Sequence, residues 1–259
     1  MPFSRLPAGS RPGIPDVVKT VITLVTLGMP IAPWAEEALR PSAWVMRSSD
    51  LATPVYLQAS GRPGPVTLVV GGIHGDEIAG MTAAQQLAKT KPGRGKLVII
   101  PVANRPAAES GVRTAYFMQD LNRAFPGNPN GSETERLAAS IMKAIARYRP
   151  DVIVDLHETG AESDPDWEEK KNTLILSPGN RAAEIALGVL ESLPASPGEK
   201  PFSFLSGAPQ GSLNREAARR FGIPVITIET SRRDALADRV GRHIDIVMRI
   251  HAATGGRAR

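Results

Sequence analysis

The sequence predicts an α/β fold in a single domain, with a central, mostly parallel (mixed) sheet flanked by helices. Short apolar runs bounded by glycine and proline alternate along the chain with longer segments of helical spacing, and strands that alternate with helices form a sheet covered on both faces. The chain has 259 residues, of which 42% are hydrophobic, enough for a sizeable core. We expect this domain to span residues 41–259, after an export signal or N-terminal extension over residues 1–40.

The N-terminal segment has the pattern of an export signal. Arg5, Arg11 and Lys19 precede an uncharged stretch, residues 20–35, which is shorter than the run of about 18 apolar residues that spans a bilayer. We therefore expect an exported protein whose membrane contact is limited to this segment. An uncleaved anchor, or an N-terminal helix packed on the domain of a cytoplasmic protein, is the alternative, because Pro33 stands where a cleavage site usually has a small residue.

The first regular elements form a βαβ unit. Val66–Gly71 and Lys96–Pro101 are short continuous apolar runs, as in buried strands. Ile78–Lys89 lies between them and has helical spacing and good helix formers. The segment before Val66 contains turn residues and short apolar stretches, so we place the start of the regular sheet at Val66.

The alternation of helices and strands continues to the C-terminus. A capping-box pattern, Ser-Glu-Thr-Glu, begins at Ser132 and predicts a helix to about Tyr148, because Pro150 ends it. We interpret His243 and His251, in the C-terminal helical region, as surface residues. The other predicted elements are strands at residues 152–156, 173–176 and 225–229 and helices at residues 182–193 and 212–221.

Charge and cysteine content narrow the function classes. The 31 basic and 26 acidic residues give a net charge of +5, spread without a dense basic run, which argues against nucleic acid as a partner. A positive chain attracts small anionic substrates. There are no cysteines, so disulfides and thiolate chemistry are excluded, and zinc would need nitrogen and oxygen ligands.

Three predicted strands lead to residues that can do chemistry. His74, His157 and Glu229 each come at or after the end of an apolar strand. In a sheet covered by crossover helices, ligands bind at the carboxyl ends of the strands. We therefore expect these three side chains to meet at one edge.

His74 and Glu77 lie three positions apart in Gly-Gly-Ile-His-Gly-Asp-Glu, so both side chains can reach one ion. His157 would add a third ligand and leave one position open for water, the pattern of a catalytic zinc site. The alternatives are a capped helix start with a solvated His74, and a strand-end His157 bonded to a carbonyl. A phosphate cradle is disfavoured, because the turn lacks both the Gly-Lys-Ser/Thr ending and the Gly-x-Gly-x-x-Gly spacing.

Glu229 is a candidate general base beside such a metal. Burying a carboxylate at a strand end is costly unless it is paired or has a catalytic role. The alternative to the general-base role is an ion pair of Glu229 with Arg232 or Arg233. Residues 161–169 are strongly acidic and predict a solvent-facing loop, which is either a plain connection or a rim that admits cationic substrates.

Residues 104–127 predict a long ordered loop, and long loops inside compact domains are usually functional. The loop contains Arg113, Asn122 and Arg123. Arginines hold carboxylates through paired hydrogen bonds, so this loop can bind an acidic substrate. A solvated surface charge is the alternative for any one of them.

Four motifs together resemble the succinylglutamate desuccinylase and aspartoacylase branch of the zinc carboxypeptidase superfamily. They occur in the family's order, over roughly residues 66–231. The resemblance implies a zinc carboxypeptidase-like fold and one Zn²⁺ ion held by His74, Glu77 and His157, with Glu229 as general base. The motifs are GGIHGDE (71–77), DLNRAFPG (120–127), DLHET (155–159) and TIET (227–230).

The same resemblance implies roles for three residues of the long loop. Asn122 and Arg123 match the pair that grips the substrate carboxylate, and Arg113 falls where the family has the arginine that polarises the scissile carbonyl. The chain ends soon after the helix that follows Glu229, which leaves no room for the additional C-terminal β-domain of aspartoacylase-like members. The narrow substrate therefore stays open.

The function expected from the motifs is zinc-dependent hydrolysis of an amide bond in an N-acyl amino acid or short peptide that carries a carboxylate. One alternative is an exported carboxypeptidase or amidase that trims cell-wall peptides. The other is a non-catalytic binding module of the same fold.

Overall fold

The structure is a computed structural model that describes residues 39–160, 172–193 and 202–255. The expected export segment and the acidic segment 161–169 lie outside the described residues. Within the described ranges, no helix is both long enough and apolar enough to cross a membrane.

The described residues build one α/β domain around an eight-stranded mixed sheet, as predicted. The strand order is β1-β2-β4-β3-β5-β8-β6-β7. Four neighbouring pairs are parallel, and the pairs β1/β2, β2/β4 and β6/β8 are antiparallel. The strands are β1 (Ala43–Val45), β2 (Thr53–Ala59), β3 (Val66–Gly71), β4 (Lys96–Ile100), β5 (Val152–Thr159), β6 (Thr173–Leu176), β7 (Ser203–Ser206) and β8 (Val225–Ser231).

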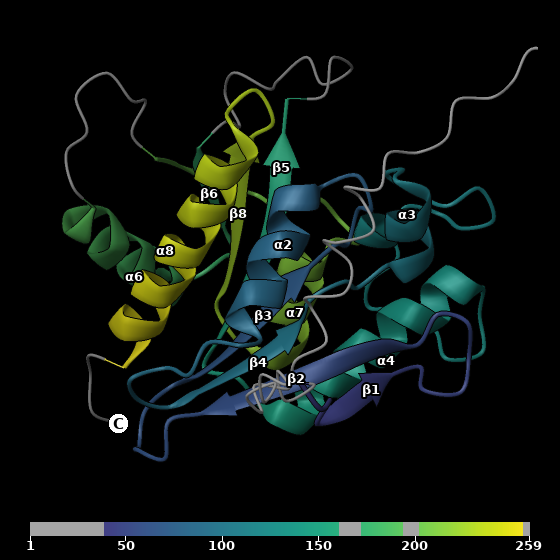
Figure 1. The fold of residues 1–259 in the computed structure, drawn as a ribbon, viewed down its shortest axis with the longest axis horizontal. Helices are drawn as coiled ribbons and strands as arrows, with labels where there is room; N and C mark the ends of the chain where they lie inside the picture. The colour runs from purple at the N-terminus through teal and green to yellow at the C-terminus, as the bar shows by residue number, and fades with distance from the viewer. Residues whose placement is uncertain (1–38, 161–171, 194–201, 256–259) are drawn as a thin grey trace, which may run out of the picture. The chain divides into compact units, whose positions relative to one another are not determined.

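Helices cover both faces of this sheet. Side chains alternate between the faces along each strand, so Leu68 and Val70 of β3 join one core cluster and Val69 joins the other. Figure 1 shows α2 and α8 on the same face, where they contact each other. One face packs against α2 (Ile78–Leu87), α6 (Asn180–Ser192) and α8 (Leu236–Thr254), and the other against α3 (Arg105–Ser110), the short 3-10 helix η1 (Leu121–Arg123), α4 (Glu133–Tyr148) and α7 (Leu213–Phe221).

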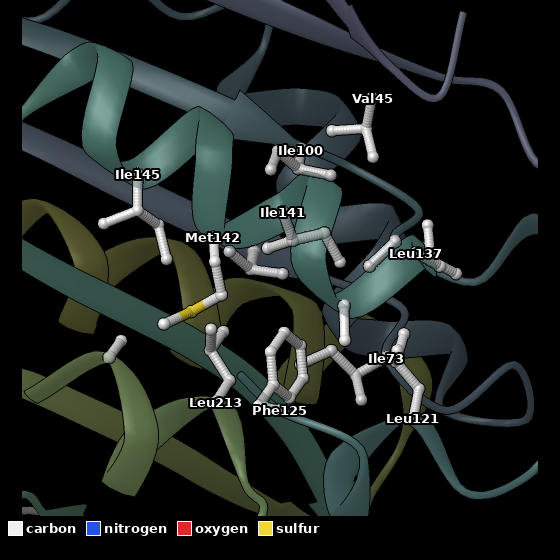
Figure 2. Packing of buried hydrophobic residues seen from close by; sticks show 14 of the residues in the cluster. Val45, Ile73, Ile100, Leu121, Phe125, Leu137, Ile141, Met142, Ile145 and Leu213 are labelled. Carbon is white, nitrogen blue, oxygen red and sulfur yellow. The ribbon is translucent and has the colours of Figure 1, made fainter. Parts of the chain in front are cut away.

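Helix α4 begins and ends where its sequence predicts. The Ser132 hydroxyl accepts the Glu135 amide at 3.3 Å, and the Glu135 carboxylate accepts the Ser132 amide at 2.8 Å, which satisfies two free amides of the first turn. Its apolar side packs toward Phe125 and Leu213 in Figure 2. Each fully buried Leu or Ile side chain there contributes about 1.5–3 kcal/mol by leaving water, so this packing fixes the segment that follows η1.

The expectation of one long loop over residues 104–127 was wrong in part, because α3 and η1 lie within it. The Asn104 side chain accepts the Ala107 amide at 3.4 Å, and Pro106 lies in the first turn of α3, both ordinary signals of a helix start. Strands β5 and β8 also run further than predicted, to Thr159 and Ser231, so His157 and Glu229 lie inside strands.

The interpretation of His243 and His251 as surface residues was wrong. Both are buried on the inward side of α8. His243 Nε2 lies 3.0 Å from the Thr230 hydroxyl, and His251 Nδ1 lies 2.8 Å from the Thr67 hydroxyl. These threonines of β8 and β3 give the imidazoles hydrogen-bond partners that allow their burial.

Candidate metal centre and substrate pocket

The parallel neighbours β3, β5 and β8 bring the predicted residues to one edge of the sheet. His74 follows β3, Glu77 stands at the N-cap of α2, and His157 of β5 lies directly opposite Glu229 of β8 in the ladder. The turn that carries His74 runs tightly past α3, since a Cβ built on Gly75 would lie 2.0 Å from the Ala107 carbonyl carbon. Only glycine fits at that position.

His74, Glu77 and His157 form a compact buried cluster. His74 Nδ1 lies 2.7 Å from Glu77 Oε1, and His157 Nδ1 lies 2.8 Å from Glu77 Oε2. One ligand atom from each residue falls within 4.8 Å of the others. The structure thus gathers the three predicted metal ligands around one point.

Two aspartates hold the outer nitrogens of these imidazoles. Asp120 Oδ1 lies 3.2 Å from His74 Nε2, and Asp155 Oδ2 lies 3.0 Å from His157 Nε2. A carboxylate in this position fixes the orientation of a metal-binding histidine and raises its basicity. Sequence reasoning gave neither residue a role, although Asp120 opens the motif DLNRAFPG and Asp155 opens the motif DLHET.

Charge coupling within this cluster is strong. Burial lowers the pKa of His74 and of His157, but the neighbouring carboxylates outweigh it and hold both pKa values above the usual range. Burial raises the pKa of Glu77, and the two imidazoles outweigh it and bring that pKa well below its usual value. The cluster therefore holds protons on nitrogens that a metal ion would displace.

The donor set fits a divalent ion. Glu77 Oε2 is buried and has no hydrogen-bond partner among the described residues other than the ion-pair contact with His157 Nδ1 at 2.8 Å. A buried oxygen in that condition is costly unless another group takes its lone pairs. Two imidazole nitrogens and one carboxylate are the ligand types of catalytic zinc sites.

Glu229 lies beside this cluster and borders the pocket. Burial of the carboxyl group raises the pKa of Glu229 to about 7, against the opposing effect of the His157 and His74 imidazoles. The alternative for Glu229 was an ion pair with a nearby arginine. Arg232 forms its ion pairs with other carboxylates, since its guanidinium lies 3.0 Å from Asp76 and 4.0 Å from Glu77. Glu229 is therefore placed to exchange a proton near neutral pH.

The three loop residues line a pocket of about 300 Å³ that also contains the cluster and Glu229. Arg113 Nη2 lies 3.2 Å from Asp120 Oδ2, and Arg113 Nη1 lies 3.8 Å from Glu77. The Asn122 side-chain oxygen accepts the Leu213 amide at 3.0 Å, which ties η1 to α7. Arg123 is exposed and donates to the Asn122 carbonyl at 2.8 Å, so its guanidinium lies at the rim.

Comparison with known sequences identifies a family and a relative of this chain. The family model for the succinylglutamate desuccinylase/aspartoacylase catalytic domain matches residues 63–237. N-alpha-acetyl-L-2,4-diaminobutyric acid deacetylase from Halomonas elongata is 38% identical over 127 residues, which are 48% of this chain and 35% of that protein. The matched part thus spans about a third of that relative.

Solved structures share the fold. A succinylglutamate desuccinylase from a Silicibacter species matches 77% of this chain and 59% of its own, with a TM-score of 0.60 and 23% identity. The product-bound cell shape determinant protein Csd4 from Helicobacter pylori matches 76% and 54%, with a TM-score of 0.66 and 20% identity. At these identities the likeness is one of fold.

Proposed function

Because the chain belongs to the succinylglutamate desuccinylase/aspartoacylase family, we propose that it is a zinc-dependent hydrolase that cleaves the amide bond of N-acyl amino acids or short acylated peptides. The observation that carries the proposal is the placement of one proton-exchanging carboxyl group, Glu229, beside three converging ligands in a pocket that arginines line. These are the parts that amide hydrolysis by activated water requires.

Zinc held by His74, Glu77 and His157 would supply a Lewis acid and lower the pKa of water. Glu229 takes one proton from the attacking water and gives it to the leaving nitrogen, so the carbon–nitrogen bond breaks and an acid and an amine form. Burial raises the pKa of Glu229, and the charge of a bound zinc ion would lower it again, so this carboxyl group is suited to take up one proton and return it.

The cationic side of the pocket orients the substrate. The Arg113 guanidinium, held by Asp120, stabilises the negative charge that develops on the carbonyl oxygen. Arg123 at the rim, whose guanidinium donates to the Asn122 backbone carbonyl, binds the carboxylate of the amino acid that leaves. The preference for an N-acyl amino acid is also supported by the Halomonas relative, whose name gives an N-acetylated amino acid as its substrate.

The direct test is hydrolysis of a panel of N-acyl amino acids and acylated dipeptides by the purified protein. We expect release of free amine, loss of activity on complete chelation and recovery with zinc. Glu229→Gln should lower kcat by about 10²–10⁴-fold with zinc still bound, whereas His157→Ala should lose zinc itself. Glu133→Gln, at an exposed site on α4, is the matched control. Turnover that survives both chelation and His157→Ala would remove the proposal.

A second measurement isolates the carboxylate site. Arg123→Gln should raise KM for N-acyl amino acids by about tenfold or more, because a charged hydrogen-bonded partner is lost. The matching N-acyl amino acid amides, which lack the carboxylate, should respond little. An equal change for both substrate sets would show that Arg123 does not read the carboxylate.

A further inference from the structure

A second hollow adjoins the substrate pocket on the far side of Arg123. We call it the arginine groove; it has a volume of about 750 Å³ and is lined by Arg123, Phe125, Gln210, Arg215, Glu216 and Arg219. Arg123 lines both hollows. The loop of residues 207–212 divides them, with Gly207, Ala208 and Pro209 on the pocket side and Gln210 and Gly211 on the groove side.

This dividing wall is closely packed. A Cβ built on Gly211 would lie 2.3 Å from the Arg123 carbonyl oxygen, and the Phe125 amide donates to the Gly211 carbonyl at 3.0 Å. Just beyond the loop, the Leu213 amide donates to the Asn122 side chain. The backbone of the loop 207–212 thus contacts the backbone of residues 123–125, and this contact holds the backbone of Arg123 at the boundary between the pocket and the groove.

The charge of the groove is unbalanced. Arg219 Nε is 2.9 Å from Glu216 Oε2, so that pair is nearly neutral. Arg123 and Arg215 are both exposed, and neither forms an ion pair with a carboxylate of the described residues. Two guanidinium groups thus remain for a ligand, and guanidinium favours carboxylate through paired hydrogen bonds. Phe125 and Pro126 add an apolar wall.

We propose that the arginine groove is a binding subsite for the leaving part of the substrate, and that it selects leaving groups longer than one amino acid that carry an additional carboxylate near Arg215. The inference rests on the proposed function. A leaving amino acid that continues as a peptide has no carboxylate at this position for Arg123 to bind. Such a peptide would extend over the exposed side chain of Arg123, the residue that lines both hollows, into the groove. The substrate class is thus acylated short peptides with an acidic residue after the scissile amide.

Product binding tests this without turnover. The probes are L-alanyl-L-glutamate and L-alanyl-L-glutamine, which have nearly the same shape and differ by one carboxylate. The wild-type protein, loaded with zinc, should bind the glutamate dipeptide about two- to fivefold more tightly in calorimetry, the range of an exposed ion pair. The preference should shrink with added salt.

Variants of Arg215 then test whether this residue causes the preference for the glutamate dipeptide. Arg215→Gln should bind the two dipeptides about equally, and Arg215→Lys, which keeps the charge, should retain part of the preference. Arg220→Gln is the matched control, because Arg220 is an exposed arginine of the same helix that does not line the groove. It should keep the full preference.

The inference is overturned if the wild-type protein binds both dipeptides equally, or if Arg215→Gln and Arg220→Gln reduce the preference by the same factor, since that would be a general charge effect. Because the dipeptides are products, these results do not depend on catalysis. A protein that keeps the preference but hydrolyses neither N-acyl amino acids nor acylated peptides would contradict the proposed function and leave the carboxylate-binding groove in place. Hydrolysis of N-acyl amino acids but of no acylated peptide would overturn the substrate class inferred here.

Discussion

His243 is a fully buried imidazole that makes the folded protein sensitive to acid. Burial lowers the pKa of His243 to about 3, against a usual value of 6.5. Between these values the unfolded chain binds a proton that the folded chain excludes, so the free energy of unfolding falls as pH decreases from 6.5 toward 3. This residue alone should contribute a slope of up to about 1.4 kcal/mol per pH unit.

The test of His243 is urea denaturation of the wild type and of His243→Gln at several pH values. Glutamine keeps a donor and acceptor for Thr230 but does not titrate. We expect the difference in unfolding free energy between the two proteins to narrow as pH falls. A difference that stays constant from pH 7 to pH 4 would show that His243 does not titrate on unfolding.

Asp120 joins the proposed metal ligands to the cationic side of the pocket. Its carboxylate contacts His74 Nε2 and Arg113 Nη2 and accepts the Asn122 amide at 2.8 Å. Asp120→Asn should weaken zinc binding by about 10–100-fold and also lower kcat, because Arg113 loses its anchor. Competition with a chelator measures the first effect and steady-state kinetics the second. Asp50→Asn, at an exposed site, should change neither.

At this scale the sequence reveals residues whose own chemistry points to a ligand or a base, and it misses residues that act through a neighbour, even where they open a motif, as Asp120 and Asp155 do. His74, His157 and Glu229 were predictable because each ends or extends an apolar strand. The contacts of Asp120 and Asp155 with imidazoles depend on the register between segments far apart in the chain. The burial of His243 depends in the same way on Thr230, a partner that helical spacing alone cannot reveal.

The turn between β3 and α2 depends on close contact with α3. In Gly75→Ala the new methyl group would meet backbone atoms of Ala107 and Ala108 within 2.2 Å, so α3 or the turn must move. We expect a loss of roughly 1–3 kcal/mol in unfolding free energy together with weaker zinc binding, because His74 and Glu77 flank the glycine. Gly93→Ala, where a Cβ meets nothing within 4 Å, is the control, and equal effects of the two changes would contradict this account.

Among the elements, buried strands and the long helices were predictable, whereas the half-exposed edge strands and the short helices α3 and η1 were not. The strands β3, β4, β5 and β8 lie in the interior of the sheet and read as continuous apolar runs. The missed strands β1, β2 and β7 are at or next to an edge, and their exposed and buried positions mix with proline or serine. Their pairing partners, more than their own composition, make them strands.

The whole domain should be more stable with the metal than without it. His74 lies in the turn after β3, Glu77 at the N-cap of α2 and His157 within β5, so the site exists only in the folded state. Free zinc at 100 times its dissociation constant should add about 2.7 kcal/mol and raise Tm by roughly 5–10 °C. Thermal scans with and without zinc measure this, and His157→Ala should abolish the shift. A wild-type Tm that ignores zinc would argue against a specific site.

The order of the strands along the chain has a consequence for the time course of synthesis. All three metal ligands are present once β5 has emerged, whereas Glu229 arrives only with β8, which pairs with β5. Contacts between distant segments form late, because the long intervening chain must first be ordered. A nascent chain that extends only through β5 therefore carries all three residues that would hold the ion but lacks Glu229, the proposed base.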